Sequence, residues 1–201
     1  VEVLGEGAEQ LEETLERRYT EYTDTLARHG LDRPVWVTET STSSAPDSVV
    51  SGASSEALQA RHVVIRLVVF AAMGAEKVFW HGYRETHPDN KFHECNLRDA
   101  STGDPKPAHA TLALLVDKIG HFDRVETIRH DRVHLYRFTN PDGSKVLVGW
   151  CTSPGAMDLS EHIEGSEVIV THIVEARGGS PLVEAVDSKK VPLGESPVFV
   201  E

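Results

Sequence analysis

Hydrophobic positions in the first 120 residues follow two periods. Between residues 8 and 29 they recur at steps of three and four, which predicts a helix with one apolar stripe that ends at Gly30. The stripe comprises Leu11, Leu15, Tyr19, Tyr22 and Leu26. Two short runs of β-branched and aromatic residues, 35–39 and 76–81, predict two strands.

Two further helices are predicted in the same half of the chain. Residues 56–73 are apolar on nearly every side, so we expect this helix to pack on two faces. A third helix is predicted to begin at Pro107 and to end before Gly120. Strands that alternate with helices are typical of βαβ units, in which right-handed crossovers join parallel strands.

The pattern changes near residue 126. Residues 133–139 and 145–151 are strand-like runs joined by the turn sequence 140–144, and three more extended segments follow at 167–174, 181–186 and 197–200. These segments predict a small antiparallel β domain. The predicted fold class is therefore α/β plus all-β, with βα units over residues 1–126 and the β domain over residues 127–201.

Composition and charge exclude several classes of protein. The content of 39% hydrophobic and 26% charged residues is that of a globular chain with a real core. The net charge of −12 repels phosphate backbones and anionic lipids, so we expect neither a nucleic-acid partner nor a membrane partner. The longest nearly apolar run, residues 63–74, is too short to cross a bilayer, and two cysteines are too few for a disulfide scaffold.

Glu39 is the most informative position for chemistry. It ends a predicted strand and precedes a long loop, and ligands of α/β folds bind at the carboxyl ends of strands. Trp80 ends the next strand in the same way, and His81 and Tyr83 continue outward from it. Two plainer interpretations stay open, in which Glu39 caps the following loop and Trp80 fills the core.

The sequence predicts neither a metal site nor a cofactor site. His87, His93 and Cys95 lie near one another but lack metal-ligand spacing. Nucleophile-elbow, phosphate-loop and dinucleotide-loop motifs are absent from the sequence. Cys151 lies in a predicted strand, where a buried and inert thiol is the favoured interpretation.

Four segments, Pro34–Thr40, Val78–Tyr83, Asn96–Asp99 and Lys106–Ala108, appear in an order that resembles a known family. They resemble the last quarter of the retaining (β/α)8 glycoside hydrolases of clan A, which include cellulases, mannanases, β-xylosidases and α-L-iduronidases. The resemblance implies that residues 1–126 carry the seventh and eighth barrel strands with flanking helices. It also implies that residues 127–201 are the appended β-sandwich.

Site roles follow from the same resemblance. It implies that Glu39 is the nucleophile, that Trp80 lines the sugar subsite, with His81 and Tyr83 as further sugar contacts, and that Pro107 begins the eighth helix. The substrate would be a carbohydrate, cleaved without a metal. Where the family has glycine and an aromatic residue after Thr-Glu-Thr, this chain has Ser41 and Thr42, which leaves the subfamily and the substrate open.

Much of a barrel lies outside this sequence. A complete barrel takes about 250 residues, and the family's Asn-Glu, its general acid and base, does not occur here. Retaining hydrolysis needs that second carboxyl group, so we expect the isolated chain to be inactive. Val1 is not an initiator methionine, and we interpret the chain as a fragment that pairs with the N-terminal part of the barrel or self-associates through bare strand edges.

An alternative of another class is a non-catalytic carbohydrate-binding or interaction module. In that case the β domain would be the functional unit, with aromatic side chains exposed on one sheet face. Tyr136 and Phe138 share a face of their predicted strand, and Trp150 is a third candidate. Core packing explains these three residues at least as well.

Overall fold

A computed structural model of the chain describes residues 8–44, 55–84, 93–130 and 132–201. The first half contains three helices, two strands and a 3-10 turn. They are α1 (Ala8–Arg28), β1 (Trp36–Thr40), α2 (Glu56–Ala72), β2 (Lys77–Trp80), η1 (His93–Cys95) and α3 (Pro107–Ile119). Each of the three helices begins at its predicted residue and ends within a residue or so of its predicted end.

β1 and β2 are parallel neighbours, which confirms the βαβ prediction. Trp36 lies opposite Lys77, and Thr40 lies opposite Trp80 after an irregularity in the register. The helix between them, α2, begins at a Ser55 cap whose Oγ accepts a hydrogen bond from the Leu58 amide at 3.1 Å. After α2 the chain turns at Gly74, whose φ of 89° is a conformation that favours glycine.

The second half forms a six-stranded sheet in the order β3-β4-β5-β10-β7-β8, antiparallel throughout. Its strands are β3 (Arg124–His130), β4 (Val133–Thr139), β5 (Lys145–Cys151), β7 (Glu167–His172), β8 (Val183–Asp187) and β10 (Val198–Val200). A two-stranded sheet of β6 (Gly155–Met157) and β9 (Val191–Leu193) accompanies it. The sequence pattern did not predict β3, β6 or β9, and β3 crosses the predicted boundary at residues 126–127.

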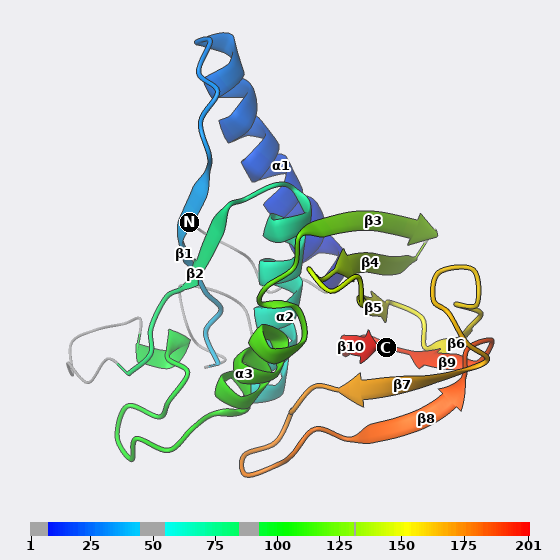
Figure 1. Cartoon of the computed structure of the whole chain (residues 1–201). Coiled ribbons are helices and arrows are strands. Elements are labelled where there is room, and N and C mark those ends of the chain that lie inside the picture. The colour runs from blue at the N-terminus through cyan, green and yellow to red at the C-terminus, as the bar shows by residue number, and fades with distance from the viewer. Residues whose placement is uncertain (1–7, 45–54, 85–92, 131) are drawn as a thin grey trace.

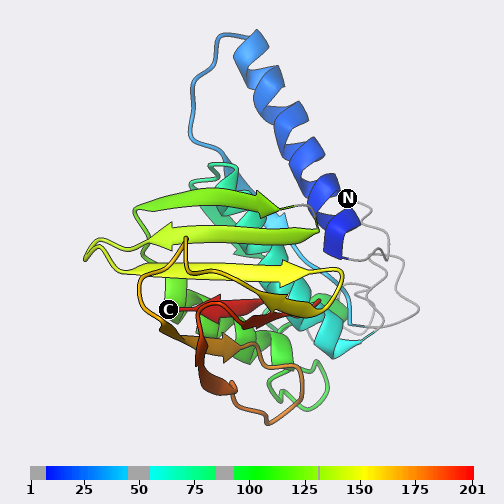
Figure 2. The ribbon, with the colours of Figure 1, turned by 90° about the vertical axis from the view of Figure 1, so that its right-hand side faces the viewer.

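Helices α2 and α3 lie between the β1–β2 pair and the six-stranded sheet (Figure 1). The same arrangement is seen from the side of the large sheet in Figure 2. One hydrophobic cluster joins the helices to a face of this sheet, through side chains such as Leu11, Val64, Leu115, Tyr136 and Phe199. The two predicted portions therefore share one core.

The opposite face of the six-stranded sheet buries a second cluster. Leu135, Leu147 and Val170 of the large sheet pack there with Leu159 and with Val191 of β9. Apolar residues consequently point to both faces of the central strands, with helices on one side and the small β6–β9 sheet on the other. The arrangement is thus α/β plus a sandwich of antiparallel sheets.

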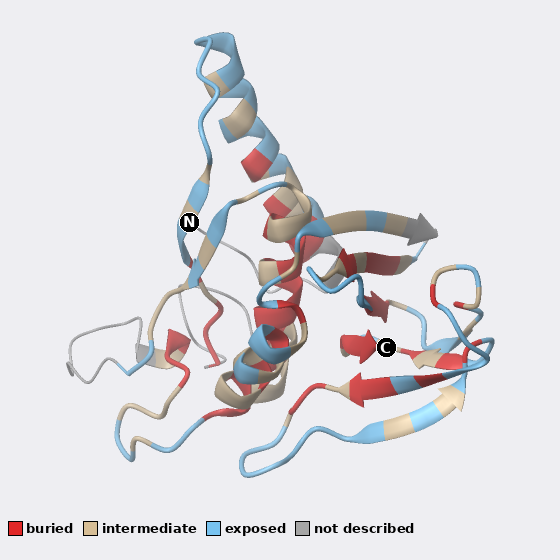
Figure 3. Ribbon diagram, viewed as in Figure 1, coloured by how far each residue is buried: buried red, intermediate tan, exposed pale blue. Residues whose placement is uncertain are grey.

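Two parts of the first half leave large aromatic side chains exposed. The far end of α1 projects from the body and is mostly exposed (Figure 3). Its Tyr22 is 57% exposed. On the open face of the β1–β2 pair, Trp36 and Phe79 are 50% and 46% exposed, and their ring centroids lie 6.4 Å apart. Within the described residues no helix or strand covers this face, although parallel strands normally bury both of their faces.

Candidate functional site

The candidate site lies at the carboxyl ends of β1 and β2. Thr40 pairs with Trp80, and the His81 amide donates to the Thr40 carbonyl at 2.9 Å. Glu39 immediately precedes Thr40, so the register brings three of the predicted site residues to one sheet edge. The Glu39 side chain is exposed, and no hydrogen bond or ion pair engages its carboxylate within the described part of the chain.

The predicted sugar contacts differ in how freely they face solvent. Trp80 is half-buried: its ring packs against the core cluster, and its indole N–H donates to the Cys95 carbonyl at 3.0 Å. Tyr83 lies farther out in the loop and is 59% exposed. Its hydroxyl accepts from Arg98 Nη1 at 3.4 Å, and its ring lies 5.9 Å from that of His109.

Three buried polar residues of α2 hold the segment that follows Glu39. We call Gln59, His62 and Arg66 the α2 polar stripe; none is more than 3% exposed. Gln59 Nε2 donates to the Thr42 carbonyl at 2.8 Å, and Arg66 donates to the hydroxyls of Thr42 and Thr40 at 2.9 and 3.1 Å. These contacts hold Thr40 and Thr42, which follow Glu39 in the sequence. They therefore fix the backbone on the C-terminal side of Glu39.

The sequence analysis did not identify the α2 polar stripe, because it described this helix as apolar on nearly every side. The spacing of the three polar residues nevertheless indicates a shared face. Positions 59, 62 and 66 are three and four residues apart, so they share one helix face, and three long polar side chains on one face of a buried helix need a polar partner.

Burial and nearby positive charge set the protonation of the stripe. Burial, and then the charges of Arg66 and Arg61, lower the pKa of His62 to about 3, so its ring is neutral. Because the Thr42 hydroxyl accepts from Arg66 Nε, its own hydrogen is available to His62 Nδ1, 3.2 Å away. This network assigns the ring proton of His62 to Nε2.

The neutral His62 predicts a specific loss of stability in acid. Its folded pKa of about 3 lies below the ordinary value of 6.5, so between these pH values the unfolded chain binds a proton that the folded chain does not. The contribution of neutral His62 to the free energy of unfolding is therefore intact above pH 6.5. As the pH falls below 6.5, that free energy decreases by about 1.4 kcal/mol per pH unit. Urea unfolding from pH 7 to pH 4 measures it.

The matched variants for this measurement are His62→Asn and His29→Asn. Asparagine at 62 keeps an acceptor for Thr42 but does not titrate, so its pH slope should be shallower than that of the unmodified chain. His29 is exposed, and its replacement should leave the slope as it was. Equal slopes for the unmodified chain and His62→Asn would show that His62 does not titrate on unfolding.

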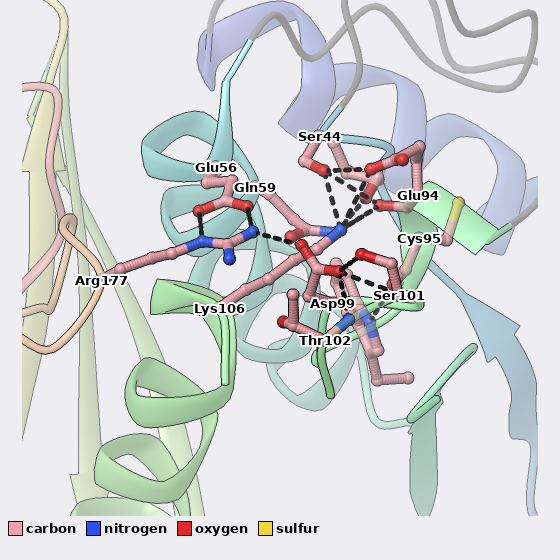
Figure 4. Close-up of polar contacts among 12 residues, drawn as sticks. Ser44, Glu56, Gln59, Glu94, Cys95, Asp99, Ser101, Thr102, Lys106 and Arg177 are labelled. Atoms are coloured by element: carbon pink, nitrogen blue, oxygen red, sulfur yellow. Dashed lines mark hydrogen bonds and ion pairs between the residues drawn. The ribbon is translucent and has the colours of Figure 1, made fainter. Parts of the chain in front are cut away.

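Lys106 joins the segment after β1 to η1. Its Nζ is buried and lies 3.0 Å from Ser44 Oγ and 3.2 Å from Glu94 Oε2 (Figure 4). Gln59 Nε2 also donates to the Glu94 carbonyl, at 3.0 Å. The lysine of the Lys-Pro-Ala motif is thus an internal anchor of the site, in addition to preceding α3.

The possible metal ligands are not gathered in the part of the chain that the structure describes. His87 lies outside the described residues. Cys95 and Cys151 are buried free thiols, and burial raises the pKa of each. No group of three His, Cys, Asp or Glu side chains placed to hold a metal occurs among the residues described.

None of the described helices combines the length and apolar character needed to cross a bilayer.

The aromatic residues proposed for a binding module are core residues. Tyr136, Phe138 and Trp150 are at most 1% exposed, because the helices cover their face of the sheet. The expected exposed aromatic platform is therefore wrong for these three positions.

Comparison with known proteins finds a structural likeness only. No family model and no curated sequence matches the chain. A family 39 glycoside hydrolase from the gut symbiont Bacteroides cellulosilyticus WH2 superposes with a TM-score of 0.61 at 17% identity, over 85% of this chain and 34% of that one. SrfJ from Salmonella typhimurium gives a TM-score of 0.46 at 12% identity, over 88% of this chain and 37% of that one.

The chain spans about a third of the length of these structures. Over most of its residues it has the fold of the corresponding part of a family 39 glycoside hydrolase.

Proposed function

We propose that this chain is the C-terminal part of a retaining glycoside hydrolase and that Glu39 is its nucleophile. The observation that carries the proposal is an exposed, unengaged carboxylate at the carboxyl edge of two parallel strands, in a fold shared with a glycoside hydrolase. The α2 polar stripe supports the role, since a nucleophile needs a fixed backbone.

The proposed reaction proceeds in two steps. A Glu39 carboxylate oxygen attacks the anomeric carbon while the bond from that carbon to the leaving oxygen breaks, and a general acid protonates that oxygen. The same group then takes a proton from water, which attacks the anomeric carbon and releases Glu39. Trp80, His81 and Tyr83 would contact the sugar.

We propose that the general acid comes from outside the described residues. It has to be a protonated carboxyl group roughly 5 Å from the nucleophile. Glu94 is paired with Lys106, and Asp99 is paired with Arg177. A carboxylate held by a cation favours its ionised form, so neither group is suited to donate a proton.

We propose that the remaining units of a (β/α)8 barrel supply this acid. Among the residues that the structure describes, the two-stranded β1–β2 sheet has unpaired edges, and the exposed Trp36 and Phe79 match the inward face of a barrel strand. Further parallel strands would pair with those edges and cover the two rings. The substrate class is an oligosaccharide or polysaccharide with O-glycosidic bonds.

The experiment compares residues 1–201 with the full product of the reading frame that contains them, on a panel of 4-nitrophenyl glycosides. We expect only the full product to hydrolyse a member of the panel, and proton NMR to show that the first sugar formed retains its anomeric configuration. Inversion, or hydrolysis by the isolated chain, would contradict the proposal. If the isolated chain forms oligomers that lack activity, this would support the proposal that further βα units are needed to complete the site.

A further inference from the structure

The connection between β7 and β8 reaches back to the candidate site through Arg177. Its guanidinium donates to both carboxylate oxygens of Glu56, from Nε at 2.9 Å and from Nη2 at 2.5 Å (Figure 4). The same Nη2 donates to Asp99 Oδ2 at 2.9 Å. Arg177 therefore joins three elements: the six-stranded sheet, the first turn of α2 and the loop between β2 and α3.

Asp99 uses its other carboxylate oxygen to organise the loop itself. Oδ1 accepts from the Ser101 hydroxyl at 2.6 Å and from the amides of Ser101 and Thr102 at 2.9 and 3.1 Å. Bonds from Ser101 and Arg177 hold the pKa of Asp99 well below its usual range. We call residues 98–105 the Asp99 turn; an antiparallel bridge from Arg98 to Pro105 closes it.

The Asp99 turn begins at the residue that contacts Tyr83. The Arg98 amide donates to the Tyr83 carbonyl at 3.1 Å, and Arg98 Nη1 donates to the Tyr83 hydroxyl at 3.4 Å. Arg98 Nε donates back into the turn, to the Gly103 carbonyl at 2.7 Å. Contacts therefore run without a break from Arg177 through Asp99 and Arg98 to Tyr83.

We propose that Arg177 is a positioning residue, through which the six-stranded sheet holds the Asp99 turn and, with it, Tyr83. The role of Tyr83 as a sugar contact rests on the proposed function, whereas the positioning itself is a property of this chain. On this account the antiparallel sheet is part of the site's framework.

The ion pairs of Arg177 should stabilise the Asp99 turn while contributing little to the stability of the whole fold. The side chains of Arg177, Glu56 and Asp99 are 43%, 27% and 23% exposed, and partly exposed ion pairs contribute little to global stability. A second contact, from Arg61 Nε to Glu175 Oε1 at 2.5 Å, ties the same connection to α2 independently. Loss of Arg177 should therefore loosen the turn while the sheet stays docked.

Amide hydrogen exchange of Arg177→Met in the 201-residue chain tests this proposal. We expect exchange at Arg98, Asp99 and Gly103 to rise by about threefold to thirtyfold, since local opening no longer breaks two ion pairs. Exchange in β4 and β5 should stay unchanged. Arg177→Lys cannot bridge two carboxylates bidentately. Its exchange at the turn should therefore be intermediate between that of the unmodified chain and that of Arg177→Met.

Arg17→Met is the matched control, because it removes an exposed ion pair with Glu21 on α1, away from the turn. The proposal is overturned if Arg177→Met exchanges at the turn as the unmodified chain does, or if Arg17→Met loosens the turn equally. A global rise in exchange would also contradict it. None of these readouts depends on hydrolysis, so they are separate from a failure of the proposed function.

Discussion

On the proposed function, replacing Glu39 with glutamine in the full product of the reading frame is expected to lower kcat/KM on aryl glycosides by about 10⁴-fold or more. The neutral amide keeps the size of the carboxylate but cannot form the glycosyl ester. Because the Glu39 side chain is exposed and has no hydrogen bond or ion pair among the described residues, the substitution should leave folding intact. The measurement is initial-rate kinetics, with circular dichroism as the check on the fold.

Glu13→Gln serves as the control for this prediction. Glu13 is also an exposed glutamate, on α1, and it lies far from Glu39 in the sequence. Its replacement removes one negative charge, as the Glu39 variant does, and should change kcat/KM by less than about twofold. Full activity of Glu39→Gln, or an equal loss in Glu13→Gln, would reject the assigned role of Glu39.

Trp150→Ala is expected to destabilise the isolated chain by about 3–5 kcal/mol. Trp150 is fully buried on β5, and its ring stacks with those of His134 and Tyr136 at centroid distances of 5.6 and 5.3 Å. Removing the indole leaves a cavity at the junction of sheet and helices. Urea unfolding followed by circular dichroism measures the effect.

Trp36→Ala provides the matched tryptophan control. Trp36 is half-exposed on β1, where it donates to Glu76 and lies under Lys77, and its loss should cost about 1 kcal/mol or less. The comparison also tests whether the helices and the sheet share one core. Two separate transitions, with Trp150→Ala affecting only one of them, would mean that the halves fold independently.

The helices and the parallel strand pair were predictable because local signals agree with one another. The stripe of α1 has a clear helical period, and α3 begins at Pro107 and ends before Gly120. Two short apolar strands on either side of a helix leave a parallel pair as the favoured arrangement. The meeting of Glu39 and Trp80 at one edge followed directly from that pairing.

The missed strands and the shared core depend on contacts between distant residues. β3 carries Arg124, Glu126 and Arg129, so its pattern looks polar, yet every residue of it pairs with β4. β6 and β9 are three residues each and form only because they pair with one another. A burial pattern in one segment cannot reveal that helices from the first half cover the sheet of the second.

The contacts of Arg177 were also beyond the sequence pattern. Arg177 meets Glu56 across 121 positions of the chain and Asp99 across 78. Only the fold shows that these charges converge, since charged residues are common on protein surfaces and their sequence positions do not identify their partners. Glu39 was accessible to sequence reasoning because it ends a predicted strand, and the spacing of Gln59, His62 and Arg66 carried a signal for the α2 polar stripe. The contacts of Lys106 and Arg177 were not accessible in this way.

The measurement that tests the central claim most directly is to trap the glycosyl intermediate and locate it. The full product would be treated with an activated 2-deoxy-2-fluoro glycoside, whose fluorine slows release of the sugar ester, and then digested and analysed by mass spectrometry. The account predicts one added sugar on the peptide that contains Glu39 and none in Glu39→Gln. A sugar attached to another carboxylate would contradict it.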